Sequence, residues 1–222
     1  MLNELFELCE KTELDLVKIE ECIVKNNFST YDITYFANVL VDKYIYEYED
    51  REAELERPPK PNELVSSTWL ELFPLLLRYG LNSNEIVSRD DSKLNIMNNI
   101  LFIKNGDVAP KILRLLLENK GNPNLEYNGE TIFEELDFDI WFGIVEQDNK
   151  EYLNLEIKCW LLLIAYGGQI KDIEPITMKN GYTKEAFKNF EDFSFEAKVE
   201  NDERIVRVFN KQSLELVAEC IY

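Results

Sequence analysis

Residues 110–136 read PKILRLLLENKGNPNLEYNGETIFEEL, and this stretch decides the fold that the sequence predicts. Its first part repeats apolar residues at spacings of three and four, the period of a helix with one buried face: Ile112, Leu113, Leu116 and Leu117. Gly121 is predicted to be the left-handed residue that ends this helix, and Asn122-Pro123-Asn124 predicts a turn. After a short loop, Thr131 can cap a second helix, with Glu134 completing a capping box.

This order of helix, glycine stop, loop, threonine start and helix resembles one ankyrin repeat running into the next. The positions that match the family are Leu115, Leu116, Leu117, Gly121, Pro123, Asn124, Gly129 and Thr131. Ile132, Phe133 and Glu134 stand where the family has Pro, Leu and His. The resemblance implies stacked antiparallel helix pairs that bind another protein.

The same order of helix, glycine stop and turn recurs along residues 68–190, which are predicted to hold the ankyrin-like helix pairs. Further helices are expected over 68–79, 94–104, 112–119, 132–147 and 153–166. The predicted stops at Gly80, Gly121 and Gly167 are 41 and 46 residues apart, whereas the ankyrin period is about 33. We therefore expect an irregular stack of three or four helix pairs, with insertions in the loops or longer helices.

Residues 1–57 are predicted to form an N-terminal helical region that contains a degenerate repeat. Two short helices are expected over 1–27, and Thr30 or Asp32 can cap a longer helix that runs to about Glu49. Three prolines make 58–67 a loop. A further proline, Pro74, requires the next helix either to begin near Glu71 or to kink.

The C-terminal residues 191–222 change to a period of two, which predicts a three-stranded antiparallel meander. We expect this sheet to pack on the last repeat, since a terminal repeat otherwise exposes its core face. A helix over 213–220 is the alternative. The predicted class is therefore mainly α (α+β), an irregular ankyrin-like stack capped by a small antiparallel sheet.

The composition is that of a globular protein with a strong acidic excess. The chain has 222 residues, 45% of them hydrophobic and 12% aromatic. Its formal charge is −19, from 43 acidic and 24 basic residues. This charge argues against a nucleic-acid partner, because phosphate contacts need surplus Lys and Arg, and it favours a protein partner with a basic surface. Solubility alone is the other explanation.

The cysteines and the missing histidines bear on metal sites and compartment. The chain has no His, and its four cysteines form no C-x-x-C pair, so no metal or other cofactor is predicted. Cys9, Cys22 and Cys159 fall among apolar residues, which indicates buried free thiols in a reducing compartment. The N-terminus lacks a signal-peptide pattern and no apolar run can span a membrane. These features predict a cytoplasmic protein without a membrane partner.

The candidate partner-binding surface lies between Lys120 and Lys150, where no Lys or Arg occurs. Carboxylates there alternate with aromatic and amide side chains, a mixture that suits recognition of a basic partner. The predicted contact residues are Glu126, Tyr127, Asn128, Glu130, Asp137, Asp139 and Trp141. In the alternative interpretation, Phe133, Phe138 and Phe142 are core residues and the acids are a solvated rim.

No catalytic residues are predicted. Glu134-Glu135 and Asp137-Asp139 could form a carboxylate pair, but neighbours on a helix point to different sides. The expected function is a non-enzymatic protein-binding module. Its resemblance to small bacterial ankyrin proteins, some of which act as immunity proteins, implies neutralisation of a basic toxin. The alternatives are a scaffold or regulatory subunit of a cytoplasmic complex and, less favoured, a carboxylate-based hydrolase.

Overall fold

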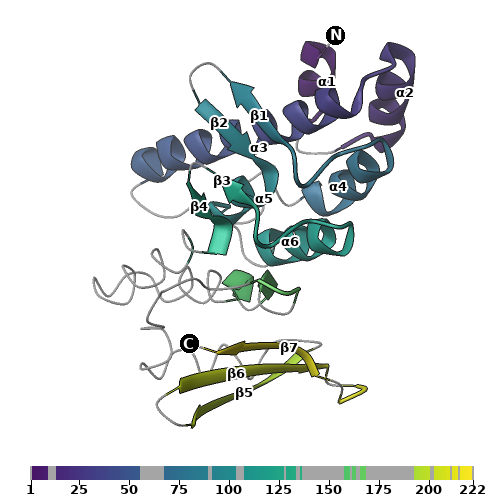
Figure 1. Cartoon of the computed structure of the whole chain (residues 1–222). Helices are drawn as coiled ribbons and strands as arrows, with labels where there is room; N and C mark the ends of the chain where they lie inside the picture. The colour runs from purple at the N-terminus through teal and green to yellow at the C-terminus, as the bar shows by residue number, and fades with distance from the viewer. Residues whose placement is uncertain are drawn as a thin grey trace. The chain divides into compact units, whose positions relative to one another are not determined.

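The computed structural model describes residues 2–9, 14–55, 68–89, 92–103, 108–127, 129–133, 136, 158–160, 162–163, 166–168, 193–200, 203–210, 212–214 and 216–221. The chain divides into two compact units, Met1–Gly121 and Asn122–Tyr222. Figure 1 shows the labelled helices in the first unit and the longest strands in the second.

The described part of the first unit contains six helices. They are α1 (Leu2–Cys9), α2 (Leu16–Asn26), α3 (Thr30–Leu55), α4 (Trp69–Arg78), α5 (Ile96–Leu101) and α6 (Val108–Glu118). They form two rows, because α1, α3 and α5 are successive neighbours, as are α2, α4 and α6. The buried residues between them include Phe36, Trp69, Leu72, Phe73, Met97 and Leu113. Each helix has one apolar face and buries it against its neighbours.

Helix α3 begins at Thr30, and its capping residue is Ser29 rather than Thr30 or Asp32, the two caps that the sequence suggests. Ser29 Oγ accepts a hydrogen bond from Asp32 N at 3.1 Å, and Asp32 Oδ2 accepts one from Ser29 N at 2.9 Å. Ser29 and Asp32 therefore form a capping box. The helix continues to Leu55 rather than ending near Glu49, since the intervening residues are mostly good helix formers such as Glu, Ala and Arg.

The left-handed residue at the end of α6 is Lys120, with φ 70°, and the prediction of Gly121 at this position was wrong. Gly80 and Gly167 do take left-handed φ values, of 99° and 88°. Gly121 instead lies where a Cβ atom would come within 2.9 Å of the Leu116 carbonyl oxygen. Glycine is therefore needed at 121 because the backbone of Leu116 comes so close. The left-handed residues 80, 120 and 167 are 40 and 47 positions apart.

One β-hairpin follows α4 in the sequence and another follows α6, and the sequence did not predict their strands. The first pairs β1 (Ile86–Arg89) with β2 (Ser92–Asn95), and the second pairs β3 (Glu126–Tyr127) with β4 (Glu130–Thr131). The helix predicted from Leu94 therefore begins only at Ile96, because Leu94 pairs with Val87 in the first hairpin. It ends at Leu101 rather than Lys104.

Pro74 lies inside α4, on its exposed side, and the helix begins at Trp69 rather than near Glu71.

Within the described residues, no helix is both long and apolar enough to cross a membrane. Cys9, Cys22 and Cys159 are buried, as predicted, and form no disulfide. The predicted proline loop over 58–67 lies outside the described residues.

The second unit contains a short buried helical segment and a separate sheet. Phe133 and Trp160 are both buried, with ring centroids 5.3 Å apart, so Phe133 is a core residue. Strands β5 (Phe193–Glu200), β6 (Glu203–Asn210) and β7 (Leu216–Ile221) form an antiparallel meander in that order. Residues 216–221 are strand, which decides against the alternative of a C-terminal helix. Packing of this sheet on the last repeat stays a prediction.

The structure confirms the predicted class, mainly α (α+β), with small antiparallel sheets.

Candidate partner-binding surface

The predicted contact residues that the structure describes lie on the β3–β4 hairpin. Glu126 on β3 and Glu130 on β4 have exposed side chains. The backbone of Tyr127 pairs with that of Glu130, and Gly129 between the strands takes φ 94°, as a tight hairpin turn requires. The structure thus brings three of the seven predicted residues together. The other four, Asn128, Asp137, Asp139 and Trp141, lie outside the described residues.

An asparagine turn holds this hairpin in place. Asn122 Oδ1 accepts a hydrogen bond from Asn124 N at 3.0 Å, and Asn122 O accepts one from Leu125 N at 3.1 Å. The side chain of Asn124 then donates to Gly167 O at 3.0 Å, 43 residues further along the chain. The turn therefore links the chain before the hairpin to Gly167 of the same unit. We call residues 120–131 the second junction.

Residues 80–95, the first junction, repeat this geometry within the first unit. Asn82 Oδ1 accepts from Asn84 N at 3.1 Å, and Asn84 Nδ2 donates to Lys120 O at 2.9 Å. Asn95 closes the junction: its Nδ2 donates to Ser83 O at 3.1 Å and to Glu85 O at 3.2 Å. Its Oδ1 caps α5 by accepting from Met97 N at 3.0 Å.

The first hairpin carries different charges from the second. Arg89 on β1 forms an ion pair with Asp42 on α3, and Lys93 on β2 is exposed. The second hairpin carries Glu126 and Glu130 instead. The strands of the first hairpin therefore carry Arg89 and Lys93, with Asp90 and Asp91 between them in the sequence, whereas the strands of the second carry two carboxylates.

Sequence reasoning missed an exposed row of side chains on α3. Tyr31 is 45% exposed and Tyr46 is 62% exposed, while Tyr35 and Val39 are half-buried. Asp42, the partner of Arg89, lies in the same row. We call these five residues the tyrosine face. Its sequence signal is a set of tyrosines at helical spacing that falls outside the apolar face of the helix.

A buried polar chain fixes α3 beside its neighbours in the first unit. Thr34 Oγ1 accepts a hydrogen bond from Asn82 N at 3.0 Å, which joins α3 to the first junction. Asn38 Nδ2 donates to Thr34 O at 2.9 Å, and Asn99 Nδ2 on α5 donates to Asn38 Oδ1 at 3.2 Å. Buried polar groups that satisfy one another specify one arrangement of the helices. The orientation of α3 and of its tyrosine face is thereby set.

Five groups in the first unit have shifted pKa values. The hydrogen bond between Asp15 and Lys18 lowers the pKa of Asp15 and raises that of Lys18. The hydrogen bonds from the Ser29 side chain and backbone lower the pKa of Asp32, so this carboxylate stays ionised at neutral pH. The hydrogen bond to Glu20 raises the pKa of Tyr79, and the distance from its Oη to Glu20 Oε1 is 2.6 Å. Burial raises the pKa of Cys22.

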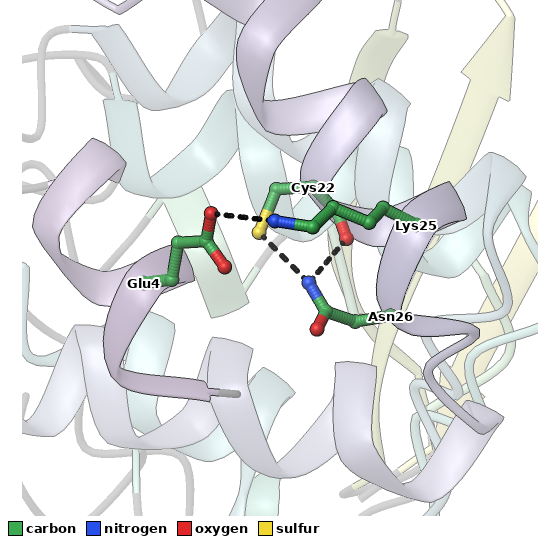
Figure 2. A network of polar contacts seen from close by, with 4 residues as sticks. All are labelled: Glu4, Cys22, Lys25 and Asn26. Carbon is green, nitrogen blue, oxygen red and sulfur yellow. Dashed lines mark hydrogen bonds and ion pairs between the residues drawn. The ribbon is translucent and has the colours of Figure 1, made fainter.

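The surroundings of Cys22 are those of a structural thiol (Figure 2). Asn26 Nδ2 donates to Cys22 Sγ at 3.5 Å and to Cys22 O at 2.9 Å. Lys25 Nζ lies 3.4 Å from Glu4 Oε1, so α1 and α2 are linked by an ion pair beside the thiol. A buried thiol with a raised pKa is protonated at neutral pH and is a poor nucleophile.

Among the described residues, no group of three or more Cys, Asp or Glu side chains is placed to hold a metal ion. Comparison of the chain with models of protein families, with curated proteins and with solved structures finds no match.

Proposed function

We propose that this protein is a non-enzymatic, ankyrin-type module that binds another protein through carboxylates on its β3–β4 hairpin. The observation that carries the proposal is the exposure of Glu126 and Glu130 on the two strands of the β3–β4 hairpin, in a chain of formal charge −19. Carboxylates on a tight, anchored hairpin attract a partner with a basic surface and fix its register.

The ankyrin assignment is supported by the order of elements at the two junctions. Each junction runs from a left-handed residue through an Asn-x-Asn turn into a hairpin, and the first hairpin leads directly into α5. The two rows of helices in the first unit are the arrangement that stacked helix pairs produce. A repeat stack of this kind offers its turns and hairpins as a continuous recognition surface.

A basic toxin is the partner that we favour, with this protein as its immunity protein in the cytoplasm. Nuclease toxins hold phosphate on basic surfaces, and an acidic module can cover such a surface and block substrate binding. The buried free thiols Cys9, Cys22 and Cys159 agree with a reducing compartment. A neighbouring gene for a large secreted protein with a basic C-terminal domain would favour this partner. A metabolic operon would favour a scaffold or regulatory subunit.

The test begins with the partner captured by pull-down from the source cell and then purified. We expect the double variant Glu126→Lys/Glu130→Lys to slow association about tenfold or more at low salt, because electrostatic steering acts on the on-rate. The difference should shrink as salt rises towards physiological strength, where the screening length is about 8 Å. Binding kinetics at two salt concentrations measure both effects.

The matched control is Glu21→Lys/Glu71→Lys, which changes the net charge by the same amount at two exposed positions on α2 and α4. If both double variants slow association equally, overall charge and not the hairpin attracts the partner. If neither variant changes association and salt has no effect, the basic-partner proposal is wrong.

A further inference from the structure

The tyrosine face lies on one side of α3 and is not part of the core. At 100° per residue, Tyr31, Tyr35, Val39, Asp42 and Tyr46 fall within an arc of about 80° around the helix axis. The opposite side is buried through Ile33, Phe36, Leu40 and Tyr44. The helix therefore buries one complete face and presents a second face that is rich in tyrosine.

Tyrosine rings at exposed helix positions need an explanation other than helix stability. Tyr is a poorer helix former than Glu, Lys or Ala, and an exposed ring leaves apolar area in water. The rings of Tyr31 and Tyr35 are nearly parallel, at 23°, with centroids 6.4 Å apart, so they form one aromatic surface. Tyrosine is enriched in protein–protein interfaces because it adds contact area at a low cost in conformational entropy.

The charge around this face identifies the chemistry of a partner. Residues 31–46 contain Asp32 and Asp42 against Lys43, and residues 47–55 add five Asp and Glu against one Arg, so the formal charge of α3 is −5. Asp42 lies within the tyrosine face, and Asp32 is next to Tyr31 in the sequence. Aromatic faces combined with carboxylates favour cations, and guanidinium groups above all, because they stack on rings and pair with carboxylates at once.

The molecule itself places an arginine on this face. Arg89 reaches from β1 and forms an ion pair with Asp42, so a guanidinium from another element is held within the row. Elsewhere in the same unit, the Arg78 guanidinium lies 5.8 Å from the centroid of the Tyr79 ring. Both contacts show the chain's own side chains using the pairing that a partner would use.

We propose that the tyrosine face is a second docking surface, which takes an extended, arginine-rich segment of the partner protein. The inference rests on the proposed function, since it assumes a basic protein partner, but it assigns a different surface and a specific side chain. From Tyr31 to Tyr46 the helix rises about 22 Å, a distance that an extended segment of about eight residues spans. Arginines at alternate positions of such a segment stack on the tyrosine rings, beside the ion pair that Arg89 forms with Asp42.

The experiment uses the full chain and two labelled eight-residue peptides, one alternating Arg and Gly and the other alternating Lys and Gly. Both carry the same charge, so simple attraction to the acidic protein binds them equally. Stacking on tyrosine favours arginine, and we expect the Arg peptide to bind about two- to fivefold more tightly for each ring engaged. Fluorescence anisotropy at a fixed, moderate salt concentration measures both dissociation constants.

Three variants test whether the tyrosines of α3 cause the preference for the Arg peptide. Tyr31→Ala/Tyr46→Ala should bring the affinity for the Arg peptide down to that for the Lys peptide. Tyr31→Phe/Tyr46→Phe should keep the preference, because the aromatic ring and not the hydroxyl contacts the guanidinium. Val17→Ala/Val24→Ala, which removes two exposed apolar side chains from α2, should also keep it. Thermal melting of each variant confirms that the fold is retained.

Three results would overturn the proposal: neither peptide binds, both bind equally well to the unmodified chain, or the Ala variant keeps the arginine preference. These failures are distinct from failure of the proposed function. The hairpin variant Glu126→Lys/Glu130→Lys leaves α3 unchanged and should weaken both peptides by the same factor. If the hairpin variant associates normally with the natural partner, the proposed function fails. If the unmodified chain still prefers the Arg peptide, the tyrosine face remains supported on its own.

Discussion

The first and second junctions of this protein have the same backbone plan but different side chains. Both contain an Asn-x-Asn turn whose second asparagine donates to a carbonyl of the next helix end, at 2.9 Å and 3.0 Å. The first hairpin has four residue pairs, with Arg89 and Lys93 on its strands, whereas the second has two pairs and exposed carboxylates. The hydrogen bonds of the turn therefore form the common framework, and hairpin length and charge are the features that vary.

The largest expected difference in stability between the junctions comes from the residue that ends the second strand of each hairpin. These residues are Asn95 and Thr131. Asn95 is fully buried and bonds two carbonyls and a helix amide, so Asn95→Ala should reduce the free energy of unfolding by about 2–4 kcal/mol. The sequence predicts that Thr131, which is buried at the end of β4, caps the following helix, so Thr131→Ala should cost about 1 kcal/mol. Urea unfolding of both variants measures the difference.

Asn95→Asp is the control for this comparison. It keeps the oxygen that caps α5 but turns the donor to Ser83 O and Glu85 O into an acceptor, so it should be about as damaging as Asn95→Ala. If Asn95→Asp is as stable as the unmodified chain, capping is the only role of Asn95. The contrast between the junctions would then disappear.

The second prediction concerns Gly121, which the sequence singled out for the wrong reason. Its φ is not left-handed, but an added Cβ would meet Met97 Sδ at 2.7 Å and Leu116 O at 2.9 Å. Gly121→Ala should therefore lower the free energy of unfolding by about 1–3 kcal/mol, since the backbone oxygen cannot move aside as a side chain can. A loss below 0.5 kcal/mol would show that the junction relaxes around the methyl group.

The third prediction concerns the left-handed residue of each junction. An L-residue in this conformation costs about 1–2 kcal/mol relative to glycine. Gly80→Ala should lose about this amount, and its methyl group would also meet Thr30 Cγ2 at 2.6 Å. Lys120→Gly should instead raise the free energy of unfolding by up to about 1 kcal/mol, part of the gain being offset by the greater freedom of glycine in the unfolded chain. Thermal unfolding of both variants should give shifts of opposite sign.

These residues explain how far the sequence predicts the fold. The helical spacing of residues 112–117, the Asn-Pro-Asn turn and the alternating C-terminal strands are local patterns, and each leads to the observed element. The role of Gly121 depends on Met97, 24 residues earlier, and no local pattern contains that contact. The β1–β2 hairpin was missed because Leu94 continues the apolar pattern of α5, although it pairs with Val87.

The candidate site was predictable only in part, for a similar reason. The absence of Lys and Arg around the β3–β4 hairpin can be counted in the sequence, so Glu126 and Glu130 were found. The tyrosine face was missed because Tyr35 and Val39, by residue type and spacing, fit the apolar pattern of α3. Separating them from the buried face requires knowing which side of α3 packs against the other helices.

The smallest expected effect on stability separates framework from recognition. Glu126→Gln/Glu130→Gln removes both hairpin charges at exposed positions and should change the free energy of unfolding by no more than about 0.5 kcal/mol, because the turn and the backbone pairs remain. Arg89→Gln at the first hairpin should cost about 1 kcal/mol, since it takes the guanidinium away from Asp42, whose side chain is only 18% exposed. Urea unfolding at low salt measures both changes.

If the double glutamine variant loses more than about 1 kcal/mol, the carboxylates of Glu126 and Glu130 contribute to folding, and their exposure no longer favours recognition. If it is as stable as the unmodified chain but associates more slowly with the basic partner, the charges of the second hairpin act in binding alone, whereas the arginine of the first hairpin also contributes to stability.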